Sequence, residues 1–167
     1  QSLLRVGFDT LDFGSFVSPK AIPQMRDTKE VLELLNLQNT STKLLAIVAN
    51  TRGAVEASAY AQIQYLGFPF SISETFQNRN TNSSIKDSLE TVKEMLSICK
   101  ENNKQLVVYL SMGFGNPYGD AWSTEIVAKW AKELVDLGVQ ILSIADTTGV
   151  STPDSIKAVF KHLTSLF

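Results

Sequence analysis

The chain has 167 residues, 44% of them hydrophobic and 19% charged, so it can bury one sizeable core and is not expected to be disordered. Its net charge of -2 gives no electrostatic reason for a nucleic-acid partner, and it has no apolar run long enough to cross a bilayer, so we expect neither nucleic acid nor a membrane as a partner. A single cysteine excludes an internal disulfide and a cysteine-rich metal cluster, which fits a reducing compartment.

The chain begins without an initiator methionine. Its first residues, Gln1–Arg5, have neither the layout of a signal peptide nor the composition of a transit peptide. We therefore expect the natural chain to begin before Gln1.

Short apolar runs predict a series of buried β-strands. Three of these runs follow a segment that looks like a helix end closed by a glycine, at Gly7, Gly67 and Gly138. Glycine readily adopts the left-handed conformation that ends a helix, so this recurring pattern predicts βα units. The predicted strands are Asp9–Phe13, Leu44–Ala49, Phe68–Ser73, Gln105–Ser111 and Gln140–Ala145.

A helix is predicted after each strand. The first spans about Pro23 to Leu37, and the second begins near Gly53. The apolar face of the second helix is predicted from residues spaced by three or four, namely Val55, Ala59, Ile63 and Leu66.

The other three helices have recognisable N-caps. The third starts at Ser83 or Ser84, the fourth at Ser123, and the fifth opens with Thr152-Pro153-Asp154. The third helix carries an apolar stripe that places its cysteine in the core, formed by Ile85, Leu89, Val92, Leu96 and Cys99.

Parallel strands joined by helices predict either an open parallel sheet or part of a (β/α)8 barrel. In both architectures the ligand lies beyond the carboxyl ends of the strands, so polar residues there are the candidates for a site. These residues are Asp12, Ser15, Asn50, Arg52, Glu74, Arg79, Asn80, Ser111, Asn116, Tyr118, Asp146 and Thr147.

Two carboxylates are the candidate catalytic groups. Asp146 follows a predicted strand directly, and a carboxylate on such a rigid support suits proton transfer or the support of a metal ligand. The alternative is that Asp146 binds the backbone amides of the turn before Thr152. Asp12 stands in the same way near the end of the first strand, with a structural cap as its alternative.

The glycine-rich stretch Gly113–Gly119 follows a strand that carries Tyr109 and Ser111. Its spacing fits neither the P-loop nor the dinucleotide fingerprint, so it is predicted to be a tight loop that lets a substrate approach. The single histidine, His162, falls late in the last helix, away from any strand end, and is not expected to be catalytic.

Three motifs in fixed order resemble the 3-hydroxy-3-methylglutaryl-CoA lyase family. They are Ser15–Lys20 with Pro23-Gln24-Met25, Gly115–Tyr118, and Asp146–Val150 with Thr152-Pro153. The resemblance covers nearly the whole chain but only an interior part of the family's domain. It implies a TIM barrel, here a single partial barrel domain over residues 1–167, from about the second strand to the sixth helix. Such a piece exposes two strand edges, so self-association, for instance as a homodimer, is expected.

The resemblance implies cleavage of 3-hydroxy-3-methylglutaryl-CoA, an acyl-CoA thioester, to acetyl-CoA and acetoacetate by a metal-assisted retro-Claisen reaction. It implies a place in leucine degradation and ketone-body metabolism, in the cytoplasm or, in a eukaryote, the mitochondrial matrix. Substrate binding is expected from Ser15, Asn80, Tyr109, Ser111 and Thr147.

Two residue types add detail to the implied site. Asp12 replaces the glutamate that in this family orients an essential arginine, and the shorter side chain is a departure from the pattern. Exposed cations could meet the phosphates of coenzyme A, although scattered surface cations are the commoner explanation. These cations are Lys20, Arg26, Arg52 and Arg79.

The metal ligands and the catalytic cysteine loop of the family have no counterpart in this sequence. A divalent cation, Mg2+ or Mn2+, is therefore expected in the full-length protein with ligands outside this chain, and the stretch alone is expected to be inactive. Two alternatives remain open. One is a synthase of the same superfamily that condenses acetyl-CoA with 2-oxo acids, although the Ser15–Lys20 loop argues against it. The other is a truncated βα module without catalytic activity.

Overall fold

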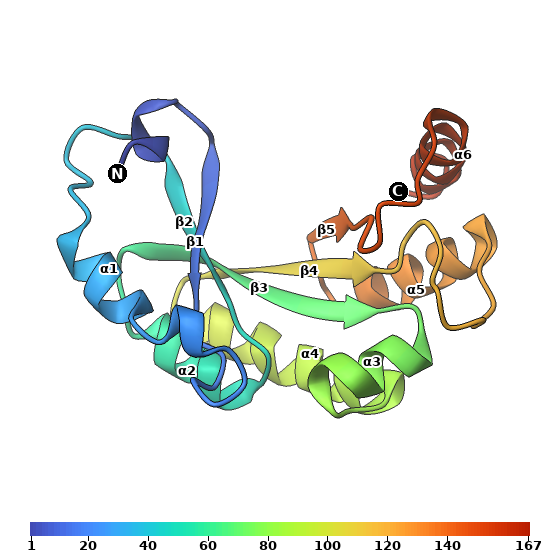
Figure 1. The fold of residues 1–167 in the computed structure, drawn as a ribbon, viewed down its shortest axis with the longest axis horizontal. Helices are drawn as coiled ribbons and strands as arrows, with labels where there is room; N and C mark the ends of the chain where they lie inside the picture. The colour runs from blue at the N-terminus through green and yellow to red at the C-terminus, as the bar shows by residue number, and fades with distance from the viewer. The chain divides into compact units, whose positions relative to one another are not determined.

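The computed structural model describes all residues from 1 to 167, in which strands and helices alternate along the chain (Figure 1). The strands form one sheet in the order β1-β2-β3-β4-β5, and β1 with β2, β2 with β3 and β4 with β5 pair in parallel. This confirms the predicted parallel βα plan. The strands are β1 (Thr10–Ser15), β2 (Lys43–Ile47), β3 (Ile63–Ser71), β4 (Gln105–Ser111) and β5 (Ile141–Ile144).

Three helices begin close to their predicted N-caps, whereas the predicted first helix is too long, because Pro23–Met25 is a 3-10 turn and Leu35 is already extended. Ser84 Oγ accepts from the Asp87 amide, Ser123 Oγ from the Ile126 amide, and Thr152 forms a reciprocal capping box with Ser155. The helices are α1 (Thr28–Leu34), α2 (Thr51–Ser58), α3 (Glu74–Thr81), α4 (Ile85–Glu101), α5 (Thr124–Asp136) and α6 (Pro153–Leu163), with 3-10 turns η1 (Leu3–Arg5) and η2 (Pro23–Met25).

The chain groups into two compact units. The N-terminal unit comprises residues 1–68 and 94–106, and the C-terminal unit comprises residues 69–93 and 107–167. No helix in the structure combines the length and the apolar character that crossing a membrane requires. Cys99 is buried as predicted, and burial raises the pKa of its thiol to about 11, so the thiol stays protonated and unreactive at neutral pH.

In the N-terminal unit, β1 lies beside β2, and their register shifts between Asp12 and Gly14 (Figure 1). Helix α2 buries its small residues, which include Ala54 and Ala57. At the N-terminal end of β3, the Lys104 ammonium donates to the backbone carbonyls of Tyr60 and Ile63, at 2.8 and 2.7 Å. This contact fixes the connection between α2 and β3.

The predicted second helix is wrong in length and in its buried face. Helix α2 ends at Ser58, and Ile63 and Leu66 belong to β3, which begins five residues before the predicted strand. Val55, predicted to be buried, is 55% exposed. The predicted helical spacing of Ile63 and Leu66 was fortuitous, because β-branched and aromatic residues in this stretch favour a strand. Gly67 consequently lies inside β3 and does not end a helix.

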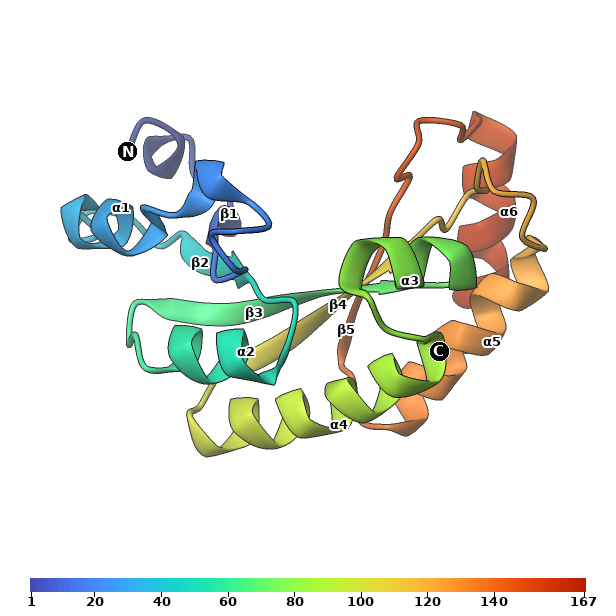
Figure 2. The same ribbon diagram turned by 60° about the horizontal axis from the view of Figure 1, so that its bottom comes forward.

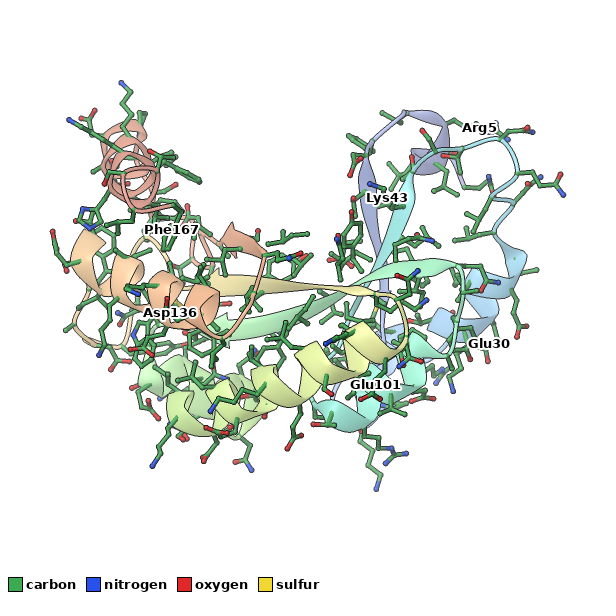
Figure 3. The ribbon with its side chains drawn as sticks, turned by 180° about the vertical axis from the view of Figure 1, so that it is seen from behind. Arg5, Glu30, Lys43, Glu101, Asp136 and Phe167 are labelled. Carbon is green, nitrogen blue, oxygen red and sulfur yellow. The ribbon has the colours of Figure 1, made fainter.

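In the C-terminal unit, β4 pairs with β5 from Val107 and Ile141 to Leu110 and Ile144. Helices α5 and α6 pack against each other (Figure 2). The sequence did not predict α3, which begins after its N-cap Ser73 and precedes the predicted third helix. Asp136 is the last residue of α5, and Phe167 is the last residue of the chain; both are labelled in Figure 3.

Candidate functional site

The loop after β1 is fixed to the strand by one buried threonine. The Ser15 amide donates to Thr28 Oγ1 at 3.1 Å, and the Thr28 hydroxyl donates to the Met25 carbonyl at 2.8 Å. Gly14 leaves room for this contact, because a Cβ there would lie 2.6 Å from Thr28 Cγ2. The predicted binding residue Ser15 is therefore buried and held in place, and its Oγ accepts from the Val17 amide at 3.2 Å.

Replacing Thr28 by valine is expected to lower the free energy of unfolding by about 2 kcal/mol, because it leaves the buried Ser15 amide without its acceptor. Valine keeps the shape of threonine but has no hydroxyl. Denaturant unfolding of the full-length protein measures the change. Thr28→Ser is the matched control, since it keeps the hydroxyl and is expected to cost about 1 kcal/mol for the missing methyl. A larger loss in the serine variant than in the valine variant would contradict the role of the hydroxyl.

The start of α2 closes against this loop. Asn50 is the N-cap, with Oδ1 accepting from the Gly53 amide at 2.9 Å, and the Phe16 amide continues the β1 ladder to Ile47 O at 2.8 Å. Beside it lies a cavity of about 320 Å³ with charged walls. Its lining includes Ser15, Met25, Arg26, Lys29, Arg52 and Glu56. Of the predicted cations, the structure thus brings Arg26 and Arg52 to one cavity.

Asp12 lies inside β1, and the prediction that it stands at the strand's end is wrong, because β1 continues to Ser15. Its side chain is exposed, yet desolvation by the surrounding protein raises the pKa of its carboxyl. A carboxyl group with a raised pKa exchanges protons more readily near neutral pH than an ordinary one.

Asp146 follows β5 directly, as predicted, and its two carboxylate oxygens are engaged by the next turn. Oδ1 accepts from the Val150 amide and Oδ2 from the Ser151 amide, each at 3.0 Å. Hydrogen bonding by the Ser151 side chain is the main cause that holds the pKa of this carboxyl below its usual range, and the backbone amides of Ser151 and Val150 add to it. The turn-binding role weighed from the sequence is present in the structure, and the catalytic role stays a prediction.

The exits of β4 and β5 are joined by Thr147. Its Oγ1 accepts from the Met112 amide at 2.7 Å, where Met112 adopts the left-handed conformation with φ 62°. Gly113 then passes so close to β5 that a Cβ would lie 2.6 Å from Ile144 Cγ2. The predicted binding residues Thr147 and Ser111 are thereby brought to neighbouring strand exits.

Two other predicted binding residues lie apart from this pair. Tyr109 is half-buried on β4, opposite Ser143 of β5. Asn80 is exposed on α3, the helix over Glu74–Thr81 that follows β3.

The sequence reasoning missed Asp120. This carboxylate accepts hydrogen bonds from Ser73 and Thr75 at the start of α3. The bond from the Ser73 hydroxyl is the main cause of the lowered pKa of Asp120. Its only signal in the sequence is an acid directly after Gly119, and its partners are some 45 residues earlier, so no local pattern could have found it.

The residues present do not fit a divalent cation. A site that holds such an ion by protein side chains alone needs several converging carboxylate, imidazole or thiolate ligands, and no group of three such side chains comes together anywhere in the chain. Asp146 is occupied by backbone amides, and Cys99 is a buried, protonated thiol.

Comparison with known proteins gives consistent matches. The family model described as HMGL-like matches residues 1–166. A curated relative from Pseudomonas aeruginosa, 3-hydroxy-3-isohexenylglutaryl-CoA/hydroxy-methylglutaryl-CoA lyase, is 32% identical over 163 residues, which cover 98% of this chain and 54% of the relative. The chain therefore spans about half the length of the curated relatives it matches.

Comparison with solved structures gives the same family. The crystal structure of the HMG-CoA lyase of Bacillus subtilis has a TM-score of 0.91 and 31% identity, covering 99% of this chain and 55% of that chain. An HMG-CoA lyase of Acinetobacter baumannii, solved in complex with coenzyme A and 3-methylmalate, has a TM-score of 0.88 and 28% identity, covering 96% of this chain and 52% of that one. The five parallel βα units are accordingly part of a TIM barrel. Because the family match extends over residues 1–166, this chain belongs to the HMGL-like family.

Proposed function

We propose that this chain forms part of a lyase that cleaves 3-hydroxy-3-methylglutaryl-CoA to acetyl-CoA and acetoacetate. The observation that carries the proposal is the likeness to the Bacillus subtilis HMG-CoA lyase, with a TM-score of 0.91 over 99% of the chain. The Acinetobacter baumannii structure supports an acyl-CoA substrate, since that protein was solved with coenzyme A. A role in leucine degradation or ketone-body metabolism, in the cytoplasm or the mitochondrial matrix, is part of the proposal.

The reaction breaks the bond between C2 and C3 of the substrate. The C3 hydroxyl loses its proton and becomes the ketone of acetoacetate, and the electron pair of the broken bond passes to the acetyl-CoA enolate, which is then protonated at carbon. Asp12 is the group of this chain whose raised pKa suits the handling of a proton. Asp146 is proposed as the second catalytic carboxylate, and its ionised form also holds the turn that carries Thr147.

Binding is the second contribution of the chain. Ser15 at the end of β1, in the N-terminal unit, and Ser111 at the end of β4, in the C-terminal unit, are each proposed as contacts of the thioester. Tyr109 and Asn80 are proposed as further contacts on β4 and α3. Because no set of residues here fits a metal, a divalent cation required by the full-length protein is proposed to take its ligands from outside residues 1–167.

Incubating the full-length protein with 3-hydroxy-3-methylglutaryl-CoA and Mg2+ or Mn2+ tests the proposal. Acetoacetate and acetyl-CoA are expected in equal amounts, measured by a coupled assay and by mass spectrometry. In a parallel reaction with acetyl-CoA and a 2-oxo acid, release of free coenzyme A without any lyase activity would instead identify a condensing synthase. If neither reaction occurs, the result supports the alternative that the protein is a non-catalytic βα module.

A further inference from the structure

One carboxylate ties the loop after β4 to the start of α3. Asp120 Oδ2 accepts from the Ser73 hydroxyl at 2.5 Å and from the Thr75 amide at 3.0 Å, and Oδ1 accepts from the Thr75 hydroxyl at 2.9 Å. The N-terminus of a helix favours negative charge, which adds to these contacts. All three donors stabilise the ionised carboxylate. At neutral pH Asp120 is therefore charged, and both of its oxygens accept hydrogen bonds that anchor the loop.

The anchor continues into the ends of two strands. Ser73 is only 1% exposed, and its amide donates to Ser71 Oγ at 3.0 Å. The Ser71 hydroxyl in turn donates to the Ser111 carbonyl at 3.3 Å. Ser71 is the last residue of β3 and Ser111 the last of β4. Asp120 is therefore connected, through buried hydrogen bonds, to the rigid strand ends where the proposed substrate lies.

The segment that Asp120 anchors presents an aromatic ring and a cation. Asn116 Oδ1 accepts from the amides of Tyr118 and Asp120, at 3.0 and 3.1 Å, and so shapes the turn. The Tyr118 ring stacks on Phe76, with centroids 6.4 Å apart, and the Arg79 guanidinium lies 4.8 Å from the Tyr118 centroid. Phe76 and Arg79 are both on α3, the helix whose start Asp120 grips.

We propose that Asp120 is a positioning residue for the acyl-CoA substrate, because it joins the loop that carries the Tyr118 ring to the helix that carries the Arg79 cation. This inference rests on the proposed function. It assigns Asp120 no contact with the reacting atoms, so its loss is expected to weaken substrate binding more than the chemical step.

The test compares Asp120→Ala and Asp120→Asn in the full-length protein, with Asp136→Asn as the matched control. Asp136 is an exposed carboxylate of the same unit, at the end of α5 (Figure 3). The alanine variant is expected to raise KM for 3-hydroxy-3-methylglutaryl-CoA about tenfold, with kcat changed less than about threefold. The asparagine variant is expected to stay within about threefold of the wild type in KM, because its amide oxygen can accept from Ser73 and the Thr75 amide while its NH2 group donates to the Thr75 hydroxyl.

Three outcomes would overturn the inference in an active wild type: an unchanged KM in Asp120→Ala, a loss confined to kcat, or an asparagine variant as impaired as the alanine variant. If Asp120 has a purely structural role, Asp120→Ala lowers the melting temperature but leaves the KM of the folded enzyme unchanged. An unchanged KM therefore distinguishes that role from the proposed one.

A second readout does not need activity. The Trp122 indole donates to the Gly113 carbonyl at 3.1 Å and so reports on the anchored loop. In a Trp130→Phe background, Asp120→Ala is expected to increase acrylamide quenching of Trp122 about twofold, because the freed loop admits the quencher. Unchanged quenching would overturn the inference. A wild type that does not cleave the substrate would count against the proposed function, while the quenching still decides whether Asp120 holds the loop.

Discussion

Replacing Asp146 by asparagine is expected to lower turnover of the full-length protein by at least about 100-fold, the effect of losing a positioned proton-transfer group. The structure adds a second cause. Both carboxylate oxygens accept backbone amides, from Val150 and Ser151. Asparagine has only one acceptor, so one amide would face an NH2 group and the turn carrying Thr147 would shift. Steady-state kinetics with a correctly loaded metal measures the change.

The pH profile separates the two causes. Hydrogen bonding, chiefly from Ser151, lowers the pKa of Asp146 below that of an unfolded aspartate, about 3.9. Its contribution to stability is therefore complete above the unfolded pKa and is lost as the pH falls through the folded pKa. Between pH 5 and 8 the group stays ionised, so an anchoring role predicts no titration of activity by Asp146 in that window. A proton-transfer role predicts that the variant loses an ionisation seen in the wild-type profile.

Asp154→Asn is the matched control for this prediction, because Asp154 is an exposed carboxylate in the first turn of α6. Its turnover is expected to stay within about twofold of the wild type. Unchanged turnover in Asp146→Asn would remove Asp146 from the mechanism and would leave Asp12 as the catalytic carboxyl of this chain.

Gly53→Ala is expected to lower the free energy of unfolding by about 2 kcal/mol, an effect of overpacking. A Cβ at Gly53 would lie 2.7 Å from the Phe16 carbonyl oxygen, and a backbone atom cannot turn away as a flexible side chain does. Alanine favours a helix over glycine by about 1 kcal/mol, so a net loss would show that the contact with the loop outweighs helix propensity. Denaturant unfolding of the full-length protein gives the change.

Arg52→Ala provides the comparison, because Arg52 is the preceding residue of α2 and its side chain is exposed. Its stability is expected to change by less than about 0.5 kcal/mol. A Gly53→Ala variant as stable as the wild type would show that the loop after β1 can move away from α2 without loss of stability.

Local sequence signals were sufficient wherever the cause of a structure is local. Ser123 and Thr152 cap the helices that follow them, and Gly138, with φ 106°, ends α5 in the left-handed conformation. The stripe of α4 buries Val92 and Cys99 as predicted. In each case a few neighbouring residues accept hydrogen bonds from free backbone amides, end a helix, or form one apolar face. The pattern is therefore visible in the sequence.

Local signals failed where a distant partner decides. Spacing alone could not show that Ile63 belongs to a strand, because that depends on its pairing with Leu44 of β2. Helix α3 has little apolar periodicity, and its N-terminus is held by the caps Ser73 and Asp120. Asp120 itself has no sufficient local signal, since its partners Ser73 and Thr75 are contributed by the preceding βα unit.

The sequence by itself determined the alternation of strands and helices, apart from α3, and the strand exits at which polar residues such as Ser111 and Asp146 fall. Only the tertiary structure decided what those residues do. It engaged the carboxylate of Asp146 with turn amides, raised the pKa of Asp12 by desolvation and gave Asp120 an anchoring role. The physical reason is that hydrogen bonding and desolvation depend on atoms brought close by folding, whereas periodicity and capping depend on neighbours along the chain.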